Sequence, residues 1–487
     1  MFNDSKKPSI KLNYIYRLIY EVLTMFLPFI TAPYIARVLG ADGVGIFSYT
    51  QSFMMYFTIF ASLGSISYAT REIAQCRDDK KKYSKTFWEM EIIIVCSTAV
   101  CLLVWMGIIY FSTSYKVYFI AMIPHLVSVA FDISWFYTGH EKIAYTIIWN
   151  SICKIIGVVC IFVFVNDNTD IAIYILINSL VLMIGNMSMW MFLPKMIERV
   201  SIRSFVFKKH LKETFIYFVP TIATSIYTVL DKTLIGLITH DNFENGYYEQ
   251  ATKIINMAKT GVFVSVNSVM GARISYLFSI EKNNEIKEKI GKALSFILLL
   301  AYGAMFGIIS VASTFVPVFY GDGYYSVIRL LYCMSPLIVI IGISSCLGVQ
   351  YYTPAGLRAQ STKYIISGSV INLIMNLIFI PLLGAMGAVM GSILAEIVIT
   401  ILYVKNCNSY LKWGKILEES YKRIIAGIIM MVFVLFINRI LFQTKLLVLV
   451  LQITLGVIIY FIVLILLKDK LMLESLNKYM LKVGNKK

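Results

Sequence analysis

Four otherwise apolar segments of the chain carry polar side chains at steps of three, four or seven residues. Residues at this spacing share one face of a helix. A face turned to lipid has no use for hydrogen-bonding groups, so such a face is expected to border protein or a water-filled cavity. The sets, with the proline and glycine that fall in step with them, are Tyr14, Arg17, Glu21, Thr24, Pro28 and Thr31; Ser48, Gln51, Thr58, Ser62 and Ser65; Tyr217, Thr221, Thr224, Thr228 and Asp231; and Lys253, Asn256, Thr260, Asn267 and Gly271.

Charged residues in or beside these sets indicate a binding cavity more strongly than the hydroxyls do. A charge at the middle of a membrane helix costs ~2.5–3.5 kcal/mol on insertion scales. For some of them an alternative stays open, because Arg17, Asp231 and Lys232 lie within a few turns of a predicted helix end and could snorkel to the interface. For the hydroxyls, close helix packing in lipid is an equally good explanation. The charged residues concerned are Arg17, Glu21, Asp231, Lys232, Lys253 and Lys259.

Other polar residues deep in apolar segments are interpreted as structural. Asp132, with His125 and Ser128 on the same face, is expected to form a structural ion pair with Lys154, and a direct functional role is the alternative. Inter-helix hydrogen bonds are expected of Asn372, Asn376 and Glu396, and solvated loop positions of His140, His210 and His240.

No catalytic constellation accompanies these residues. The chain has no Gly-rich phosphate loop, no HExxH and no GxSxG. Its eight cysteines show no CxxC spacing, which argues against a disulfide framework and a zinc site. The pattern therefore predicts a binding protein and not an enzyme, with no metal and no cofactor.

The elements that position these residues are predicted to be membrane-spanning helices. Of 487 residues, 59% are hydrophobic and 15% charged, whereas soluble chains carry about half apolar and about a quarter charged residues. Apolar runs of about twenty residues, long enough to cross a bilayer as helices, predict an all-α polytopic protein with fourteen spans. These are 12–36, 44–67, 87–111, 116–138, 143–165, 171–193, 213–238, 247–274, 293–318, 327–350, 361–381, 385–404, 422–441 and 446–467.

Basic residues predict the orientation of these spans. Lys and Arg gather in alternate connections, for example Arg77 to Lys85 and Lys195 to Lys212, whereas the intervening connections are poor in them. Since basic segments stay in the cytoplasm, both chain ends are predicted to be cytoplasmic. The net charge of +17 reflects this topology better than it indicates nucleic-acid binding.

A weak internal duplication predicts two lobes. The segment from Pro28 resembles the segment from Pro220, and the segment from Lys142 resembles that from Lys363. We expect six-helix, pseudo-symmetric lobes at 1–200 and 205–405, followed by two further helices and a tail at 406–487. Repeats of this kind in transporters place the substrate between the halves.

Several segments, in order, resemble one family. They are LGADGVGIFSYTQSFMMYFTIFASLGSISYATREIA, DISWFYTGHEKIAYTIIWNSICKII, VPTIATSIYTVLDKTLIG with NGYYEQATKI, and INLIMNLIFIPLLGAMGAVMGSILAE. The chain is similar in them to the O-antigen and capsular polysaccharide repeat-unit flippases of the multidrug/oligosaccharidyl-lipid/polysaccharide exporter superfamily. One departure is VMGARIS at Val269–Ser275, where the family usually has a proline.

The resemblance implies a central cavity lined by the first, second, seventh and eighth helices, and alternating access in the bacterial inner membrane. The implied cargo is an undecaprenyl-pyrophosphate-linked oligosaccharide for surface polysaccharide, and a polymerase is a conceivable partner. Expected contacts with pyrophosphate or anionic sugar come from Arg17, Lys253 and Lys259, and sugar hydrogen bonds from Gln51, Tyr227 and Asn256. For Glu21 and Asp231, ion coupling and a structural role are equally good readings.

Two alternatives stay open. A drug or metabolite exporter of the same superfamily should have twelve spans and a narrower, more acidic or aromatic cavity, so the two extra helices and the lysines of 247–274 weigh against it. A membrane polysaccharide polymerase usually needs a large outward loop with catalytic residues. The outward connections of this chain are short.

Overall fold

The computed structural model describes residues 10–440 and 445–474, and those residues contain helices and turns but no strand. The all-α fold expected from the sequence is confirmed. The chain divides into two compact units, Met1–Gly236 and Leu237–Lys487. In the described part, eleven helical segments are long and apolar enough to cross a membrane. The count of fourteen spans remains a prediction.

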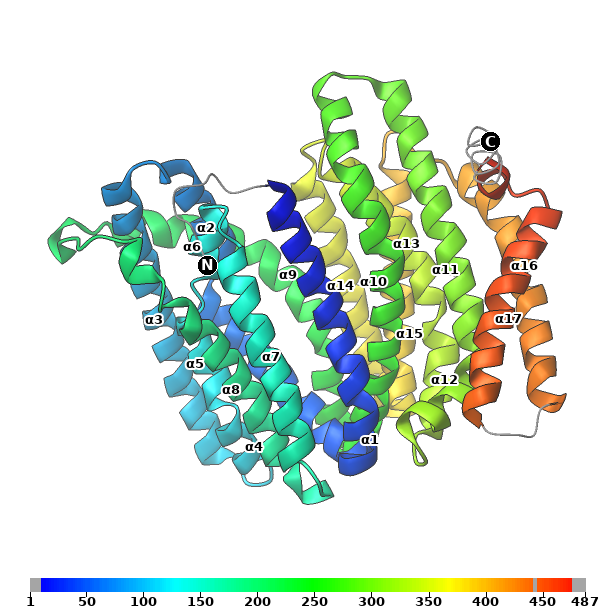
Figure 1. The fold of residues 1–487 in the computed structure, drawn as a ribbon, viewed down its shortest axis with the longest axis horizontal. Coiled ribbons are helices and arrows are strands. Elements are labelled where there is room, and N and C mark those ends of the chain that lie inside the picture. Colours follow the sequence, from blue (N-terminus) through cyan, green and yellow to red (C-terminus); the bar gives the residue numbers. More distant parts are fainter. Residues whose placement is uncertain (1–9, 441–444, 475–487) are drawn as a thin grey trace, which may run out of the picture. The chain divides into compact units, whose positions relative to one another are not determined.

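The first unit contains α1 to α8 and most of α9, which Figure 1 draws in blue to green. Short 3₁₀ turns occur at Asn168–Asp170, Leu193–Lys195 and Ile202–Ser204. The helices are α1 (Ile10–Ser62), α2 (Ser65–Cys76), α3 (Lys80–Phe111), α4 (Lys116–Ala121), α5 (Ile123–Ala130), α6 (Ser134–Gly139), α7 (Ala144–Phe164), α8 (Ile171–Met189) and α9 (Phe207–Thr239).

Helix α1 contains both of the first two predicted spans, 12–36 and 44–67, up to Ser62. A straight helix of its 53 residues would be about 80 Å long, far more than a hydrocarbon core of about 30 Å. The helix is interrupted at Gly40, where φ is 67° and ψ is −179°. This backbone region is essentially restricted to glycine, so Gly40 separates the two passes.

The predicted span 116–138 is broken into α4, α5 and α6. Pro124 stands in the first turn of α5, where its missing N–H costs no helical bond. Residues 131–133 then form a turn before α6 begins at Ser134. The break interrupts the helical hydrogen bonds, and the side chains of Asn186 on α8 and Trp190 just after α8 donate to carbonyl groups there.

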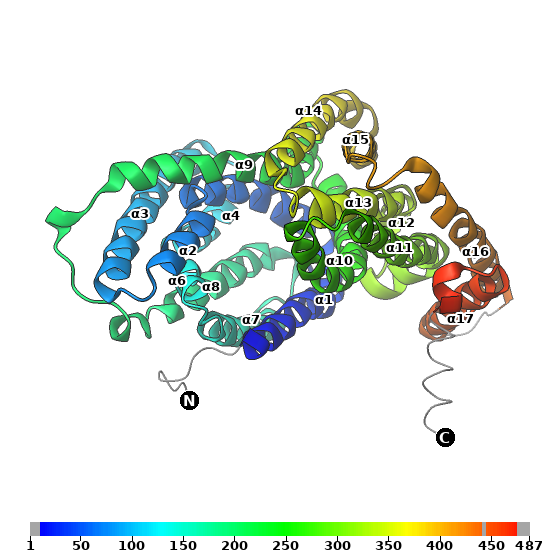
Figure 2. The ribbon, with the colours of Figure 1, turned by 90° about the horizontal axis from the view of Figure 1, so that it is seen from above.

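The second unit holds the remaining helices, which Figure 2 shows from above. In α14 and α15, an extra methyl group at Gly387 would lie 2.3 Å from the Phe379 carbonyl oxygen, so these helices approach closely. A π-helical turn follows α13 at Gly348–Tyr352. The helices are α10 (Asn242–Ser279), α11 (Asn283–Tyr320), α12 (Tyr325–Met334), α13 (Pro336–Leu347), α14 (Arg358–Leu383), α15 (Ala385–Lys405), α16 (Trp413–Ile440) and α17 (Lys445–Leu466).

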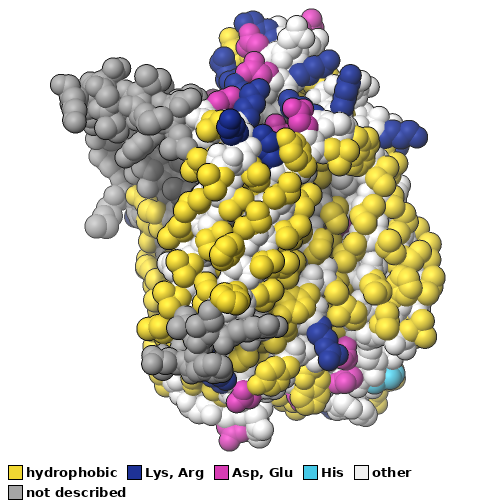
Figure 3. Space-filling view, turned by 90° about the vertical axis from the view of Figure 1, so that its right-hand side faces the viewer, with side chains coloured by type: hydrophobic (Ala, Val, Ile, Leu, Met, Phe, Trp, Pro, Cys, Tyr) yellow, Lys and Arg dark blue, Asp and Glu magenta, His cyan; other side chains and the backbone are white. Residues whose placement is uncertain are grey.

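The face over α16 and α17 is apolar on its outside. Figure 3 shows hydrophobic side chains covering most of this face, with charged side chains gathered mainly at one end. Exposed large hydrophobic residues include Val432, Phe433 and Phe436 on α16 and Val450, Val457 and Ile462 on α17. Soluble monomers rarely expose so much continuous apolar surface, so this face is suited to lipid.

Candidate functional site

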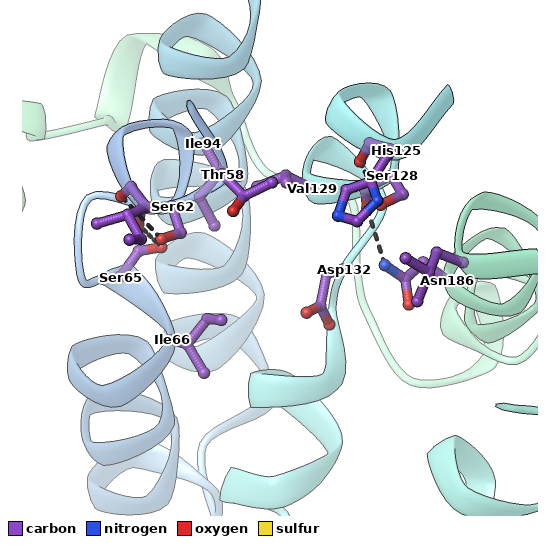
Figure 4. A pocket seen from close by; sticks show the side chains of 12 residues that line it. Thr58, Ser62, Ser65, Ile66, Ile94, His125, Ser128, Val129, Asp132 and Asn186 are labelled. Atoms are coloured by element: carbon purple, nitrogen blue, oxygen red, sulfur yellow. Dashed lines mark hydrogen bonds between the residues drawn. The ribbon is translucent and has the colours of Figure 1, made fainter. Parts of the chain in front are cut away.

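A pocket of about 260 Å³, lined by both polar and apolar side chains, lies in the first unit. In Figure 4, Thr58, Ser62 and Ser65 lie on one side and His125 and Asn186 on the other. The side chain of Asp132 is beside the space between them. The lining residues are Thr58, Ile59 and Ser62 of α1, Ser65 and Ile66 of α2, Ile94 of α3, His125, Ser128 and Val129 of α5, Asp132, and Leu182 and Asn186 of α8.

The break after α5 forms one wall of this pocket. Asn186 Nδ2 donates to the Ser128 carbonyl at 2.9 Å, and Trp190 Nε1 donates to the Phe131 carbonyl at 3.0 Å. Asp132 Oδ1 accepts from the Ser134 N–H at 3.0 Å and so starts α6. Irregular backbone at membrane depth is tolerated where protein groups bind it or where it borders a cavity. Both conditions are met here.

The opposite wall comes from the polar stripe predicted for 44–67. Thr58 Oγ1 donates to the Met55 carbonyl at 2.8 Å and Ser62 Oγ to the Ile59 carbonyl at 3.0 Å. Each hydroxyl therefore donates its hydrogen bond to a carbonyl of its own helix. Its oxygen can still accept a hydrogen bond from the pocket. Asp132 and His125, both half-buried, are the titratable groups of the lining. The residues that line the pocket can form hydrogen bonds and bind a proton, and they include no activated nucleophile.

The ion pair expected between Asp132 and Lys154 is wrong. Lys154 Nζ donates instead to the Tyr20 hydroxyl at 2.9 Å, and it lies 4.6 Å from the centre of the Tyr20 ring. The cation therefore joins α7 to α1. Spacing alone placed the two charges in neighbouring helices, but it did not reveal the aromatic partner.

His210 is not on a solvated loop, as the sequence had suggested, but is 5% exposed on α9. Its Nδ1 lies 2.9 Å from the Tyr68 hydroxyl oxygen, and its Nε2 lies 3.0 Å from Glu89 Oε2. Glu89 Oε1 also accepts from the Val206 N–H at 2.6 Å. This network binds the start of α9 to α2 and α3. Sequence reasoning missed it because each of its hydrogen bonds joins residues more than a hundred positions apart.

His140, also expected on a solvated loop, is half-buried after α6. Its Nδ1 lies 2.9 Å from the Phe136 carbonyl. Burial lowers the pKa of His140, so the neutral ring is favoured at neutral pH. By contrast, His240 is exposed, as expected.

Gln51 and Asp231, two sequence-predicted site residues, both belong to the first unit. Gln51 is partly exposed on α1, and Asp231 is 5% exposed on α9. The charge of Asp231 acts on the Tyr56 hydroxyl, which is 3.1 Å from Thr233 Oγ1. Thr233 also donates to Ser52 Oγ at 2.9 Å. Asp231 thus lies where α1 and α9 are joined by hydroxyls; neither Gln51 nor Asp231 lines the pocket.

Three predicted site residues lie on helices, but their side chains are outside the described part of the structure. Arg17 and Glu21 belong to α1, and Tyr227 belongs to α9. Their proposed contacts remain predictions.

Lys253, Asn256 and Lys259 follow one another along α10 in the second unit. Lys253 Nζ lies 3.4 Å from Glu249 Oε1, one turn earlier. Asn256 is exposed. Lys259 is partly buried, and the charge of Glu396 on α15 acts on it. Lys253 and Lys259 therefore each have an acidic neighbour within their unit.

The inter-helix hydrogen bond expected from Asn372 is confirmed. Its Nδ2 donates to Ser392 Oγ at 3.4 Å, joining α14 to α15, and Asn376 Nδ2 donates to Asn372 Oδ1 at 3.1 Å.

Comparison with known proteins identifies relatives along most of the chain. A family model described as "Polysaccharide biosynthesis protein" matches residues 10–278. A putative O-antigen transporter of Escherichia coli (strain K12) is 25% identical over 418 residues, which cover 83% of this chain and 98% of the relative. A putative O-antigen transporter of Shigella dysenteriae is 23% identical over 383 residues, covering 78% and 95%.

Solved structures show the same fold. The lipid II flippase MurJ in an inward closed conformation superposes with a TM-score of 0.71 at 16% identity, covering 94% of this chain and 99% of that one. The multidrug transporter DinF-BH superposes with a TM-score of 0.57 at 14% identity, covering 84% and 98%. At these identities the likeness concerns the fold.

Proposed function

The chain belongs to the family of polysaccharide biosynthesis proteins, and from this we propose that it is a flippase that carries a lipid-linked oligosaccharide across the bacterial inner membrane. The observation that carries the proposal is the similarity along 98% of the length of a protein named as a putative O-antigen transporter. The exporter fold agrees with it. The chain is a multi-pass membrane protein and not an enzyme.

The physical problem that such a protein solves is the transfer of a polar headgroup past hydrocarbon. Burying sugar hydroxyls without hydrogen-bond partners costs several kcal/mol for each group. Helices that are apolar outside and carry polar faces inside supply those partners. The hydroxyl stripe of α1, the pocket of the first unit and the amide and lysines of α10 are such groups.

The finer proposal concerns the cargo and the cycle. The cargo is an undecaprenyl-pyrophosphate-linked repeat unit for O-antigen or capsule, moved from the cytoplasmic to the outer face. Arg17, Lys253 and Lys259 bind its phosphates or sugar acids, since ammonium and guanidinium groups form strong hydrogen bonds to phosphate. Gln51, Tyr227 and Asn256 bind sugar. Lobes at 1–200 and 205–405 rock about this site, and both chain ends are cytoplasmic.

Deletion of the gene in its host tests the proposal. We expect loss of surface polymer together with completed lipid-linked units that remain on the cytoplasmic side, and recovery when the gene is returned on a plasmid. Polymer loss with single units outside would indicate a polymerase instead. Unchanged polysaccharide with altered drug sensitivity would indicate an exporter.

Replacing Lys259 by alanine is expected to lower export about tenfold or more at normal protein levels. A hydrogen bond to a charged group contributes about 1.5–3 kcal/mol, and 1.4 kcal/mol is a factor of ten. Surface polysaccharide and protein amount are measured in the complemented deletion strain. Lys259→Arg should retain most export.

Two control variants separate binding from charge balance. Lys282, which is exposed and paired with Glu285 at 2.7 Å, should tolerate alanine. Lys259→Ala combined with Glu396→Gln removes both charges of the α10–α15 neighbourhood. Recovery of export in this double variant would show that Lys259 serves only to balance Glu396, and full export in Lys259→Ala alone would remove the residue from the site.

A further inference from the structure

Helix α3 carries two buried carboxyl groups two residues apart, Glu89 and Glu91, which are 3% and 2% exposed. Glu89 is surrounded by donors: the Val206 N–H at 2.6 Å, His210 Nε2 at 3.0 Å and Lys85 Nζ at 3.8 Å. Both carboxyl oxygens of Glu89 therefore have polar partners. The two side chains are almost equally buried, so any difference between their environments arises from their polar partners.

Glu91 has no hydrogen-bond partner on either carboxyl oxygen among the described residues. An ionised carboxylate buried in this way costs far more than a neutral acid, and such groups hold a proton instead. Asp132 lines the same pocket as Ile94 of α3, which stands one turn after Glu91. The structure therefore favours a protonated Glu91 beside a half-buried Asp132.

The pocket lies next to this part of α3 and is lined by Asp132, whereas Glu91 is not among its lining residues. Glu91 precedes Ile94 by three residues on α3, so both lie on one side of the helix, and Ile94 lines the pocket with Asp132. A volume of about 260 Å³ holds several waters, each of which needs about 30 Å³. A proton leaving Glu91 has carboxylate and water acceptors on this side.

The other titratable groups near Glu91 come from the elements packed on α3. Glu89 and Lys85 share its helix, His125 and Asp132 come from α5 and the turn after it, and Tyr68 comes from α2. Glu89, Lys85 and Tyr68 belong to the His210 network. The described residues contain no cluster of three or more His, Cys, Asp or Glu side chains suited to a metal ion.

We propose that Glu91 and Asp132 form a proton-exchange site that couples transport to the proton gradient. In one state Glu91 keeps its O–H bond in the dry interior of the first unit. When the pocket rearranges and water reaches Glu91, that bond breaks and the proton passes to the Asp132 carboxylate or to pocket water; the reverse transfer restores the acid. Only the coupling role of this site rests on the proposed function, because proton binding at the site can be measured without transport.

Proton binding is tested on the purified full chain by infrared difference spectra recorded during a pH titration. We expect a protonated-carboxyl band at neutral pH that disappears in Glu91→Gln, whereas Glu89→Gln leaves it in place. Glutamine has the shape of the neutral acid, so Glu91→Gln should fold as the wild type does. Asp132→Asn should shift the titration of the band to lower pH. A spectrum of Glu91→Gln identical to that of the wild type would overturn the site.

Coupling is tested in vesicles loaded with lipid-linked oligosaccharide, with and without an imposed pH gradient. We expect stimulation of the wild type by the gradient and loss of that stimulation in Glu91→Gln, with Glu198→Gln, an exposed carboxyl 3.7 Å from Lys80, as the control. Transport driven by sodium alone, or equal stimulation in Glu91→Gln, would overturn coupling at this site. Absence of any wild-type transport would contradict the proposed function, whereas the infrared result would still decide the proton site.

Discussion

Gly64→Ala is expected to destabilise the protein by about 3 kcal/mol or more, since backbone strain and overpacking add. Gly64 joins α1 to α2 at φ 67° and ψ 9°, a left-handed conformation that costs other residues about 1–2 kcal/mol. A methyl group there would also lie 2.7 Å from the Phe218 nitrogen and 2.9 Å from the Phe218 Cα of α9. Backbone atoms cannot rotate away as a flexible side chain can, so α9 itself must shift.

Gly356→Ala is the matched control for this variant. Gly356 has a φ of 74°, but a methyl group there meets no atom within 4 Å, so the control retains the backbone cost and lacks the collision. Thermal unfolding in detergent should show a much larger loss for Gly64→Ala than for Gly356→Ala. Equal losses would mean that α2 and α9 can separate without cost, contrary to the packing described here.

Arg423→Ala is expected to cost about 3–5 kcal/mol, the usual effect of removing one partner of a buried ion pair. Arg423 is fully buried on α16. Its Nη2 lies 2.9 Å from Glu419 Oε2 and donates to Ser295 Oγ of α11 at 2.7 Å, and its Nε lies 3.3 Å from Asp469 Oδ2. Alanine would leave Glu419 and Asp469 without their cation. The protein should therefore unfold at lower temperature, with α16 and α17 loosened from α11.

Two further variants check the cause. Arg423→Met with Asp469→Asn removes charge from both sides and should recover part of the stability, because neutral buried groups are tolerated better than an unpaired charge. Arg77→Ala, which breaks the exposed 2.8 Å pair with Glu141, should cost about 0–1 kcal/mol. If Arg77→Ala were as harmful as Arg423→Ala, burial would not be the reason.

The sequence predicted the membrane helices well because hydropathy and charge asymmetry act along the chain. Each predicted range lies on helical residues over most of its length. The breaks were harder to predict. Pro124 and Pro336 stand in the first turns of α5 and α13, and each is a local signal that divides an apolar run into shorter helices.

The pocket was predicted only in halves. Helical spacing found Thr58, Ser62 and Ser65 on one face and His125, Ser128 and Asp132 on another, but it could not show that the two faces meet across one space. Pairing between distant residues follows from tertiary packing. For the same reason the partners of His210 and Lys154 were missed.

Glu89 and Glu91 stand out in the sequence, although they belong to none of the four polar sets. They stand in FWEMEIII, where two acids interrupt an apolar run. Their opposite environments could not be predicted, since the donors to Glu89 come from residues 206 and 210.

The kink in α1 also limits which mutations the gene can accept. Any single-nucleotide change in a glycine codon that alters the amino acid adds a β-carbon. At Gly40 that carbon would occupy a φ/ψ region that costs other residues about 1–3 kcal/mol, although no atom lies within 4 Å of it. The backbone angle alone therefore constrains this codon. The open space around the position does not relax that constraint.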